Sequence, residues 1–419
     1  MRIALTSYRS RSHVGGQGVY LRHLSRELAA LGHDVEVVSG PPYPQLDDVP
    51  GVRLTELPSL DLYREPDPFR HPKREEFHGA IDVLEYAGML TGSFPEPLAF
   101  SLRAWRELRS RPRHERPDVV HDNQTLGYGM LLLQKDGLHV VATVHHPITV
   151  DRRIEAAATP PPASRGEQFL RWRNGSFVRM QKRVVRRLPS VLTVSESSRR
   201  DIIVDFEVEP SRLSVIPVGV DITTFRPSST PRRPGRLVAM ASSDIPLKGI
   251  VPLLEAVALL RRDRDVELVI VGESKDGSPA RQAIERLGLS DRVQFVSGLA
   301  ETALVEAFAT AEIGVVPSLY EGFSLPAIEL MACATPLVVT TAGALPEVVG
   351  PDGLASLHVP PGDPVALAVA IGRLLDEPEL RARLGAAGRE RVAERFDWRM
   401  VAGRTVGWYR ERLPQPALR

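Results

Sequence analysis

The chain alternates strand-like and helix-like segments, and this alternation begins twice. Arg2–Thr6 reads as a strand, and Val19–Leu31 carries apolar residues at helical spacing. After the proline-rich segment Ile216–Pro234 the pattern restarts, with a strand at Arg236–Ala241 and a helix at Ile250–Arg261. Alternating strands and helices are typical of a parallel, doubly wound sheet. The sequence therefore predicts an α/β protein made of two similar domains.

The proline-rich segment marks the expected domain boundary. We expect a first domain over residues 1–220 and a second over 221–397, with a C-terminal helix at about 398–412 packing back on the first domain. Two such domains place the carboxyl ends of two parallel sheets around a cleft, where α/β proteins bind ligands. Residues 41–117 are rich in proline and irregular, apart from a predicted helix at Leu98–Leu108. Loops of this length are usually functional or disordered.

Composition excludes several classes of protein. The 53 Lys and Arg residues balance 52 Asp and Glu residues, for a net charge of +1, so we expect no nucleic-acid partner. A single cysteine, Cys333, excludes a disulfide framework, and no His/Cys cluster has metal-ligand spacing. No apolar run of about 18 residues could span a membrane, and the N-terminus reads as a strand rather than a signal peptide. We expect a cytoplasmic protein, with the inner face of the cell membrane as the alternative.

Two glutamates flank a turn that leads into a helix of the second domain. Glu321 follows the predicted strand Ile313–Pro317, and Glu329 lies about one turn into the helix that begins near Pro326. Backbone N–H groups at such a helix start attract anions. Two carboxylates beside an anion site suit a ligand with hydroxyl groups around a phosphate, such as a nucleotide sugar. The alternative is one capping glutamate and one solvated glutamate.

A lysine and a glycine-rich segment occupy equivalent loops of the two domains. Lys248 follows the first strand of the second domain and is one of only five lysines among the 53 Lys and Arg residues. That scarcity favours a lysine-specific role, such as neutralising a diphosphate, over a solvated loop lysine. Gly15-Gly16-Gln17-Gly18 narrowly misses the dinucleotide-binding fingerprint, because Leu21 stands where the third glycine belongs. It suits a close backbone approach to a phosphate or a plain turn.

Histidines end two predicted strands of the first domain. His145 and His146 follow Val140–Val144, where a neutral imidazole could hydrogen-bond a sugar hydroxyl; a structural histidine is the alternative. His121-Asp122-Asn123-Gln124 ends another strand and is similarly placed. The basic segment Arg165–Arg187 could lie on anionic lipid or form the solvated face of a helix.

Together these motifs resemble those of the retaining glycosyltransferases of family 4, which have the GT-B fold. The resemblance covers nearly the whole chain. It rests on Gly15-Gly16, Leu31-Gly32-His33-Asp34-Val35, Thr143-Val144-His145, Val194-Ser195-Glu196-Ser197, Ile216-Pro217-Val218-Gly219-Val220-Asp221, Phe225-Arg226-Pro227, Lys248-Gly249, Glu321-x7-Glu329 and Met331-Ala332-Cys333-Ala334-Thr335-Pro336. The Glu-x7-Glu spacing in this order and context is specific.

The resemblance implies two Rossmann-like, doubly wound domains facing a central cleft. It implies transfer of a hexose from a UDP- or GDP-linked sugar to a hydroxyl of a small-molecule or lipid-linked acceptor, with no metal and no cofactor. The implied catalytic residues are Lys248 on the donor diphosphate, Glu321 on the transferred sugar and His145 near the reacting carbon. The residues implied in donor binding are Gly15, Gly16, Ser243, Lys248, Glu321, Gly322, Phe323, Ser324, Leu325 and, on the ribose hydroxyls, Glu329.

The chain departs from the family pattern at one phosphate-binding position. The family usually has an arginine shortly before the lysine, where this chain has Ser242 and Ser243. One cation on the diphosphate is therefore missing or supplied from elsewhere. In the linker, Val218 replaces the usual asparagine.

The acceptor is expected on the first domain. The candidate contacts are Tyr63, Arg64, Asn123 and His146, with Phe69 and Phe94 in the same proline-rich stretch able to shape the site. Together with the basic segment Arg165–Arg187, they favour an acceptor at or near an anionic membrane.

Three rival functions stay open at this point. A sugar-nucleotide epimerase of the GT-B fold needs no acceptor, although the Glu-x7-Glu arrangement favours transfer. An NAD-dependent oxidoreductase would explain the glycines near Gly16, and Leu21 argues against it. An inactive binding protein is disfavoured by the intact set Lys248, Glu321 and Glu329.

Overall fold

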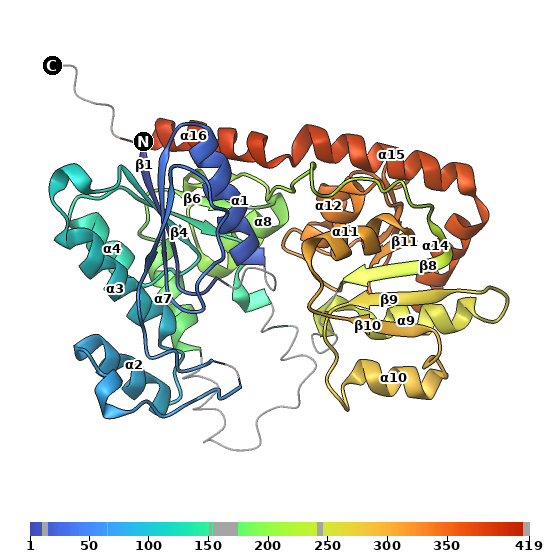
Figure 1. Cartoon of the computed structure of the whole chain (residues 1–419), viewed down its shortest axis with the longest axis horizontal. Coiled ribbons are helices and arrows are strands. Elements are labelled where there is room, and N and C mark those ends of the chain that lie inside the picture. Colours follow the sequence, from blue (N-terminus) through green and yellow to red (C-terminus); the bar gives the residue numbers. More distant parts are fainter. Residues whose placement is uncertain (11–15, 65, 151–152, 154–174, 241–245, 414–419) are drawn as a thin grey trace. The chain divides into compact units, whose positions relative to one another are not determined.

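The computed structural model describes residues 1–10, 16–64, 66–150, 153, 175–240 and 246–413 (Figure 1). The chain forms two compact units. The first comprises Met1–Val194, Arg199–Ile216 and the C-terminal residues from Trp398, and the second comprises Ser195–Ser198 and Pro217–Asp397. The chain therefore enters the second unit after Ile216, whereas the boundary expected from the sequence followed residue 220.

A parallel sheet forms the centre of the first unit. Its described strands run in the order β3-β2-β1-β4-β5-β6-β7. They are β1 (Arg2–Ser7), β2 (Asp34–Ser39), β3 (Val52–Glu56), β4 (Val119–Asn123), β5 (Val140–Val144), β6 (Val191–Thr193) and β7 (Leu213–Val215). β1 pairs in parallel with both β2 and β4, so the strand order reverses there. Ligands of open α/β sheets bind beyond the carboxyl ends of the strands at such a reversal, which directs attention to the ends of β1 and β4.

Helices cover this sheet and share its core. They are α1 (Gly16–Ala30), α2 (Ala80–Leu90), α3 (Glu96–Ser110), α4 (Tyr128–Lys135), α7 (Ser176–Val185), α8 (Glu196–Phe206) and α16 (Trp398–Arg412), with 3-10 turns η1 (Arg74–Glu76), η2 (Arg113–Glu115) and η3 (Pro210–Arg212). Phe100 of α3, Met130 of α4 and Val184 of α7 pack with the strands in one apolar cluster. The last helix, α16, packs against α1, so the two ends of the chain meet in this unit.

The second unit has its own parallel sheet, with described strands in the order β10-β9-β8-β11-β12-β13. They are β8 (Arg233–Met240), β9 (Glu267–Val271), β10 (Val293–Val296), β11 (Ala311–Val316), β12 (Leu337–Thr340) and β13 (Ser356–Val359). The helices are α9 (Ile250–Leu260), α10 (Pro279–Leu287), α11 (Glu301–Ala309), α12 (Leu325–Ala332), α13 (Leu345–Val349), α14 (Pro364–Asp376) and α15 (Pro378–Arg395), with the 3-10 turn η4 (Pro246–Lys248). β8 pairs with both β9 and β11, so this sheet reverses between β8 and β11.

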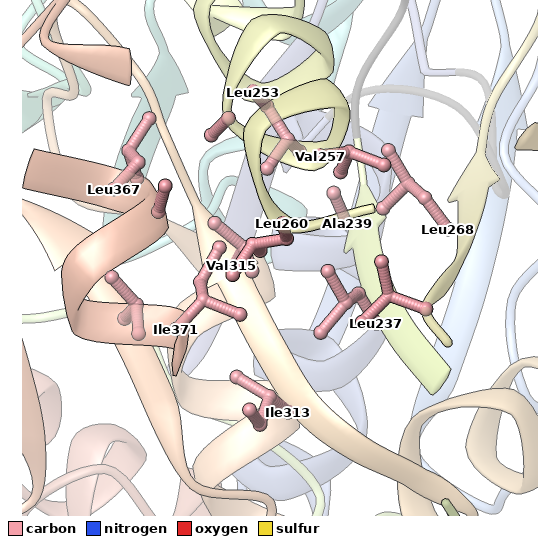
Figure 2. Packing of buried hydrophobic residues seen from close by; sticks show 14 of the residues in the cluster. Leu237, Ala239, Leu253, Val257, Leu260, Leu268, Ile313, Val315, Leu367 and Ile371 are labelled. Atoms are coloured by element: carbon pink, nitrogen blue, oxygen red, sulfur yellow. The ribbon is translucent and has the colours of Figure 1, made fainter. Parts of the chain in front are cut away.

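A closed apolar core fixes these strands. In Figure 2, Leu253 and Val257 of α9 and Ile371 of α14 surround the strand residues Leu237 and Val315. All five side chains are at most 1% exposed. The prediction of two parallel, doubly wound sheets is confirmed.

The expectation of a mostly irregular segment at residues 41–117 is wrong in part, because β3 and α2 lie there and α3 begins before the predicted helix. On α2 the exposed positions include Val83 and Leu84, whereas Asp82 and Glu85 are buried and both pair with Arg103 of α3. Two of the three buried side chains of this helix are acidic and the third is Met89, so α2 lacks the apolar periodicity that reveals a helix in a sequence. Among the described helices, none has the length and apolar character needed to cross a membrane.

Candidate functional site

Lys248 and Glu321 meet at the reversal point of the second sheet. Lys248 ends η4 after β8, and Glu321 lies in the loop after β11. The Lys248 Nζ donates a hydrogen bond to Glu321 Oε1 at 2.8 Å, and Ser318 Oγ donates to the same oxygen at 2.7 Å. The two loops are also joined directly, since the N–H of Leu319 donates to the carbonyl of Leu247 at 2.7 Å. A cation and a carboxylate are thus held together where an α/β sheet binds its ligand.

The loop between β11 and α12 has a constrained backbone. Ser324 precedes α12 with a φ of 96°, in the left-handed region that non-glycine residues rarely adopt. Two glycines allow the backbone to pass close by. A Cβ on Gly249 would lie 1.9 Å from the carbonyl oxygen of Pro317, and one on Gly343 would lie 2.2 Å from that of Glu321. Backbone strain of this kind clusters at ligand sites, because surrounding contacts must maintain it.

Two serines from a distant part of the sequence hold the same loop within the second unit. The Ser195 Oγ donates to the carbonyl of Gly322 at 2.7 Å, and the Ser198 Oγ donates to it at 3.0 Å. The carboxylate of Glu347 accepts a hydrogen bond from the N–H of Glu196 at 2.9 Å. Sequence reasoning missed the part played by Ser195 and Ser198, although Ser195 stands in one of the motifs that carry the family resemblance.

Glu329 is a buried carboxyl group on α12. Its residue is 8% exposed, and its Oε2 has no hydrogen-bond partner among the described residues. Burial raises the pKa of Glu329 to about 7, and the charge of Glu301 adds to the rise. A buried carboxyl oxygen without a donor costs free energy, so a bound ligand that donates hydroxyl groups would relieve that cost.

In the first unit, His145 follows β5 and is held by the end of β4. The His145 Nε2 lies 2.7 Å from Asn123 Oδ1, and the backbone N–H of His145 donates to Gln124 Oε1 at 2.6 Å. The amide of Gln124 in turn donates to the carbonyl of His146 at 2.9 Å. Burial lowers the pKa of His145 to about 3, with help from His146 and His121, so the imidazole is neutral at neutral pH. The structure thus brings Asn123, His145 and His146 together at the carboxyl edge of the first sheet.

A buried polar network lies behind His145. The ring of Tyr20 meets His145 edge-on with centroids 5.0 Å apart, and its hydroxyl lies 3.3 Å from Thr143 Oγ1. His121 bonds the same Thr143 oxygen at 2.6 Å through Nε2, and its Nδ1 bonds the hydroxyl of Tyr409 on α16 at 2.5 Å. His121 therefore serves a structural purpose, which is the alternative that the sequence left open for these histidines.

The other expected residues fall in different places. Gly15 and Ser243 lie outside the described residues, and Gly16 is the first residue of α1. Tyr63 lies between β3 and α2, where its ring packs on Phe94 with centroids 5.1 Å apart. Arg64 is exposed. Within the parts of the chain that the structure describes, no cluster of His, Cys, Asp or Glu could hold a metal ion.

The basic segment Arg165–Arg187 is described only from residue 175 onward. Its described part includes α7, whose apolar residues Val178 and Val184 are buried in the core of the unit. On the outer face, Lys182 and Arg186 both pair with Glu207. Most apolar residues of α7 therefore face the core, and its outer face is charged.

The chain is similar to known proteins over its whole length. Residues 14–224 match "Glycosyltransferase Family 4", and residues 221–391 match "Glycosyl transferases group 1". The chain is 53% identical over 417 residues to the MMP alpha-(1->4)-mannosyltransferase of Mycolicibacterium hassiacum, with 100% of both chains covered. It is also 29% identical over 430 residues to a D-inositol 3-phosphate glycosyltransferase of Streptomyces scabiei. That alignment covers 94% of this chain and 86% of the relative. Sucrose-phosphate synthase from Thermosynechococcus elongatus has a similar structure, with a TM-score of 0.74 at 25% identity over 98% of each chain.

Proposed function

Because the chain belongs to glycosyltransferase family 4 and has the GT-B fold, we propose that it transfers a mannosyl residue from GDP- or UDP-mannose to a sugar hydroxyl. The 53% identical relative is described as an α-(1→4)-mannosyltransferase, and the similarity extends over the full length of both chains. We therefore include the α-(1→4) linkage in the proposal. Mannose is α-linked in these donors, so an α-linked product requires retention. Family membership leaves the epimerase, oxidoreductase and scaffold interpretations without support.

The contact between Lys248 and Glu321 is the observation that carries this proposal. An ammonium group is a compact positive charge that suits a diphosphate, and the adjacent carboxylate accepts hydrogen bonds from sugar hydroxyls. Glu321 lies in the loop that leads into α12, whose first N–H groups favour an anion. One place in the second unit thus offers contacts to the diphosphate and to the sugar it carries.

The proposed reaction breaks the bond between the sugar C1 and the diphosphate oxygen and forms a bond from C1 to the acceptor oxygen on the same face. The acceptor proton passes to the departing diphosphate. Such a step needs no protein nucleophile, and its main demand is stabilisation of the charge that develops on the leaving group. Lys248 and the amides of Phe323–Leu325 would supply that stabilisation.

Glu329 in the second unit and His145 in the first unit are the other two groups with a proposed role. Glu329, with its unpartnered Oε2, would accept hydrogen bonds from the ribose hydroxyls. His145 would hydrogen-bond the transferred sugar near C1 as a neutral imidazole, a state that its lowered pKa favours. Asn123 would fix the orientation of that ring.

We propose that the acceptor is a small glycoside or a lipid-linked glycan and that Arg165–Arg187 contacts an anionic membrane. The burial of the apolar side of α7 limits this contact to charge attraction, which salt screens. Sedimentation with anionic liposomes at low salt tests it. If the protein stays in the supernatant, the membrane contact is removed from the proposal while the transfer reaction stands.

The transfer reaction is tested by incubation with GDP- and UDP-linked mannose and glucose and an α-mannoside acceptor. We expect turnover with one mannose donor and a product whose NMR couplings identify an α-(1→4) bond. A matched incubation without acceptor detects any epimer. Formation of an epimer, or of a β-linked product, would overturn the proposal.

A further inference from the structure

We propose that a cavity between α2 and α7 in the first unit binds an alkyl or acyl substituent of the acceptor. The inference rests on the proposed transfer to a sugar hydroxyl and adds the chemical class of the group attached to that sugar. It implies an amphiphilic acceptor, with a sugar at one end and hydrocarbon at the other.

The cavity has a volume of about 490 Å³. Pockets that hold small molecules generally measure roughly 300–1,000 Å³ and have mainly apolar walls. Carbon atoms form most of this wall, which includes Leu84, Ala87, Pro95, Leu98, Phe177 and Met180. The cavity opens to the surface, so a ligand could enter it without a change in the backbone.

The cavity lies in the first unit, which is the unit expected to bind the acceptor. Tyr128 and Ser176, which line it, are the first residues of α4 and α7. α4, which follows β4 directly, begins at the carboxyl edge of the sheet, where His145 also lies. Gln181 of α7 donates to the carbonyl of Gln124 at 3.2 Å, and the side chain of Gln124 in turn holds His145. The cavity and the histidine thus share one supporting loop.

A series of aromatic rings extends from the cavity. Phe94 packs on Phe177 with centroids 5.4 Å apart, and Tyr63 packs on Phe94 at 5.1 Å. Phe69 packs on Tyr63 at 5.2 Å and is itself 65% exposed. Its φ of 66° is costly for an aromatic residue, and such strain is characteristic of ligand sites. Aromatic faces pack well against the C–H faces of sugars, so these rings suit the sugar end of the acceptor.

The exposed wall of the cavity agrees with a ligand of this kind. Leu84 is 46% exposed, which leaves apolar surface uncovered at the cavity rim. The rim also carries hydroxyl groups, from Ser93, Thr91 and Tyr128. A hydrocarbon chain would cover the apolar surface, and the hydroxyl groups at the rim suit the polar part of a glycoside.

The experiment compares methyl, hexyl and octyl α-mannosides below their micelle-forming concentrations. Each buried methylene contributes to affinity, so we expect the acceptor KM of the unaltered enzyme to fall at least tenfold from methyl to octyl. Ala87→Trp fills the cavity from an exposed helix position and should abolish this trend while leaving turnover of the methyl glycoside. Val83→Trp is the matched control, because Val83 lies on the same helix, is 57% exposed and does not line the cavity. It should keep the trend.

Calorimetric binding of octyl α-mannoside separates this inference from the proposed reaction. If octyl α-mannoside binds to the unaltered enzyme but not to Ala87→Trp, the result supports the cavity as its binding site. This conclusion holds even if the enzyme turns over no mannoside. A second cavity variant, Thr91→Trp, is used if circular dichroism shows that Ala87→Trp has lost its fold. The inference would be overturned if the unaltered enzyme bound glycosides of all chain lengths equally well. It would also be overturned if both cavity variants kept the dependence of affinity on chain length.

Discussion

The two units present different chemistry at the carboxyl edges of their parallel sheets. At the reversal point of the second sheet lies an ion pair, Lys248 with Glu321, fixed by a constrained loop. The first sheet instead presents a neutral histidine, His145, supported by amides and aromatic rings. A diphosphate carries charge and needs a cation, whereas sugar hydroxyls need neutral donors and acceptors. Under the proposed function, the second unit would bind the charged donor and the first unit would contact the sugar.

Removal of the cation should have the largest effect. We expect Lys248→Ala to lower kcat by about 10²–10³-fold, the usual loss when one stabilising contact to a developing anion is removed. The fold should be retained, because Glu321 keeps its hydrogen bond from Ser318. Steady-state kinetics and thermal melting measure the two effects. Lys135→Ala, at the exposed end of α4, is the control, and near-normal turnover of Lys248→Ala would contradict the assignment.

Removal of the neutral imidazole tests the other side of the comparison. His145→Ala should lower kcat by about 10²-fold. This is the usual loss of rate when a positioned polar group that acts in the transition state is removed. Burial lowers the pKa of His145 to about 3, whereas the usual pKa of a histidine is 6.5. The neutral form of His145 is therefore fully present above pH 6.5 and is lost only as the pH falls toward 3. The pH–rate profile should therefore show no ionisation of this group between pH 5 and 8. An ionisation near pH 6.5 that disappears in His145→Ala would show that the imidazole is charged instead.

A smaller effect is expected at the support of the donor loop. Ser195→Ala removes a hydrogen bond to the carbonyl of Gly322 while Ser198 keeps its own. We expect the KM for the donor to rise about tenfold, because a loosened loop costs binding through imperfect geometry. Ser110→Ala, at the exposed end of α3, should change nothing. An unaltered donor KM in Ser195→Ala would mean that this contact does not position the loop.

The smallest expected signal concerns the proton of Glu329. Burial raises the pKa of Glu329 to about 7, above the usual 4.5 of a glutamate. The contribution of this group to folding stability is therefore fully present below about pH 4.5 and is lost as the pH rises through about 7. Hydrogen bonds from ribose would favour the charged form and release a fraction of a proton on nucleotide binding at pH 7. Calorimetry in buffers of different ionisation enthalpy measures this release. It should vanish in Glu329→Gln, and zero release by the unaltered enzyme would argue against ribose contacts at Glu329.

The sequence predicted the local parts of this molecule well and the long-range contacts poorly. Periodicity placed Lys248, Glu321 and His145 at strand ends, because a strand and the loop that follows it are adjacent in sequence. It could not reveal that Ser195 holds Gly322, 127 positions away, since nothing in a local pattern encodes that contact. α2 escaped prediction for a different reason, because two of its three buried side chains are acidic and pair with Arg103 of α3.

The docking of α16 on the first unit has a consequence for the synthesis of the chain. Tyr409 bonds His121 across 288 positions, and together with Thr143 and Tyr20 this pair backs His145. The first unit therefore lacks one of its helices until Trp398–Arg412 has been synthesised and has left the ribosome. Domains generally fold in order of synthesis, from the N-terminus. Here the second unit, which is complete at Asp397, can finish folding before the first, and the histidine specified early in the gene acquires its final support last.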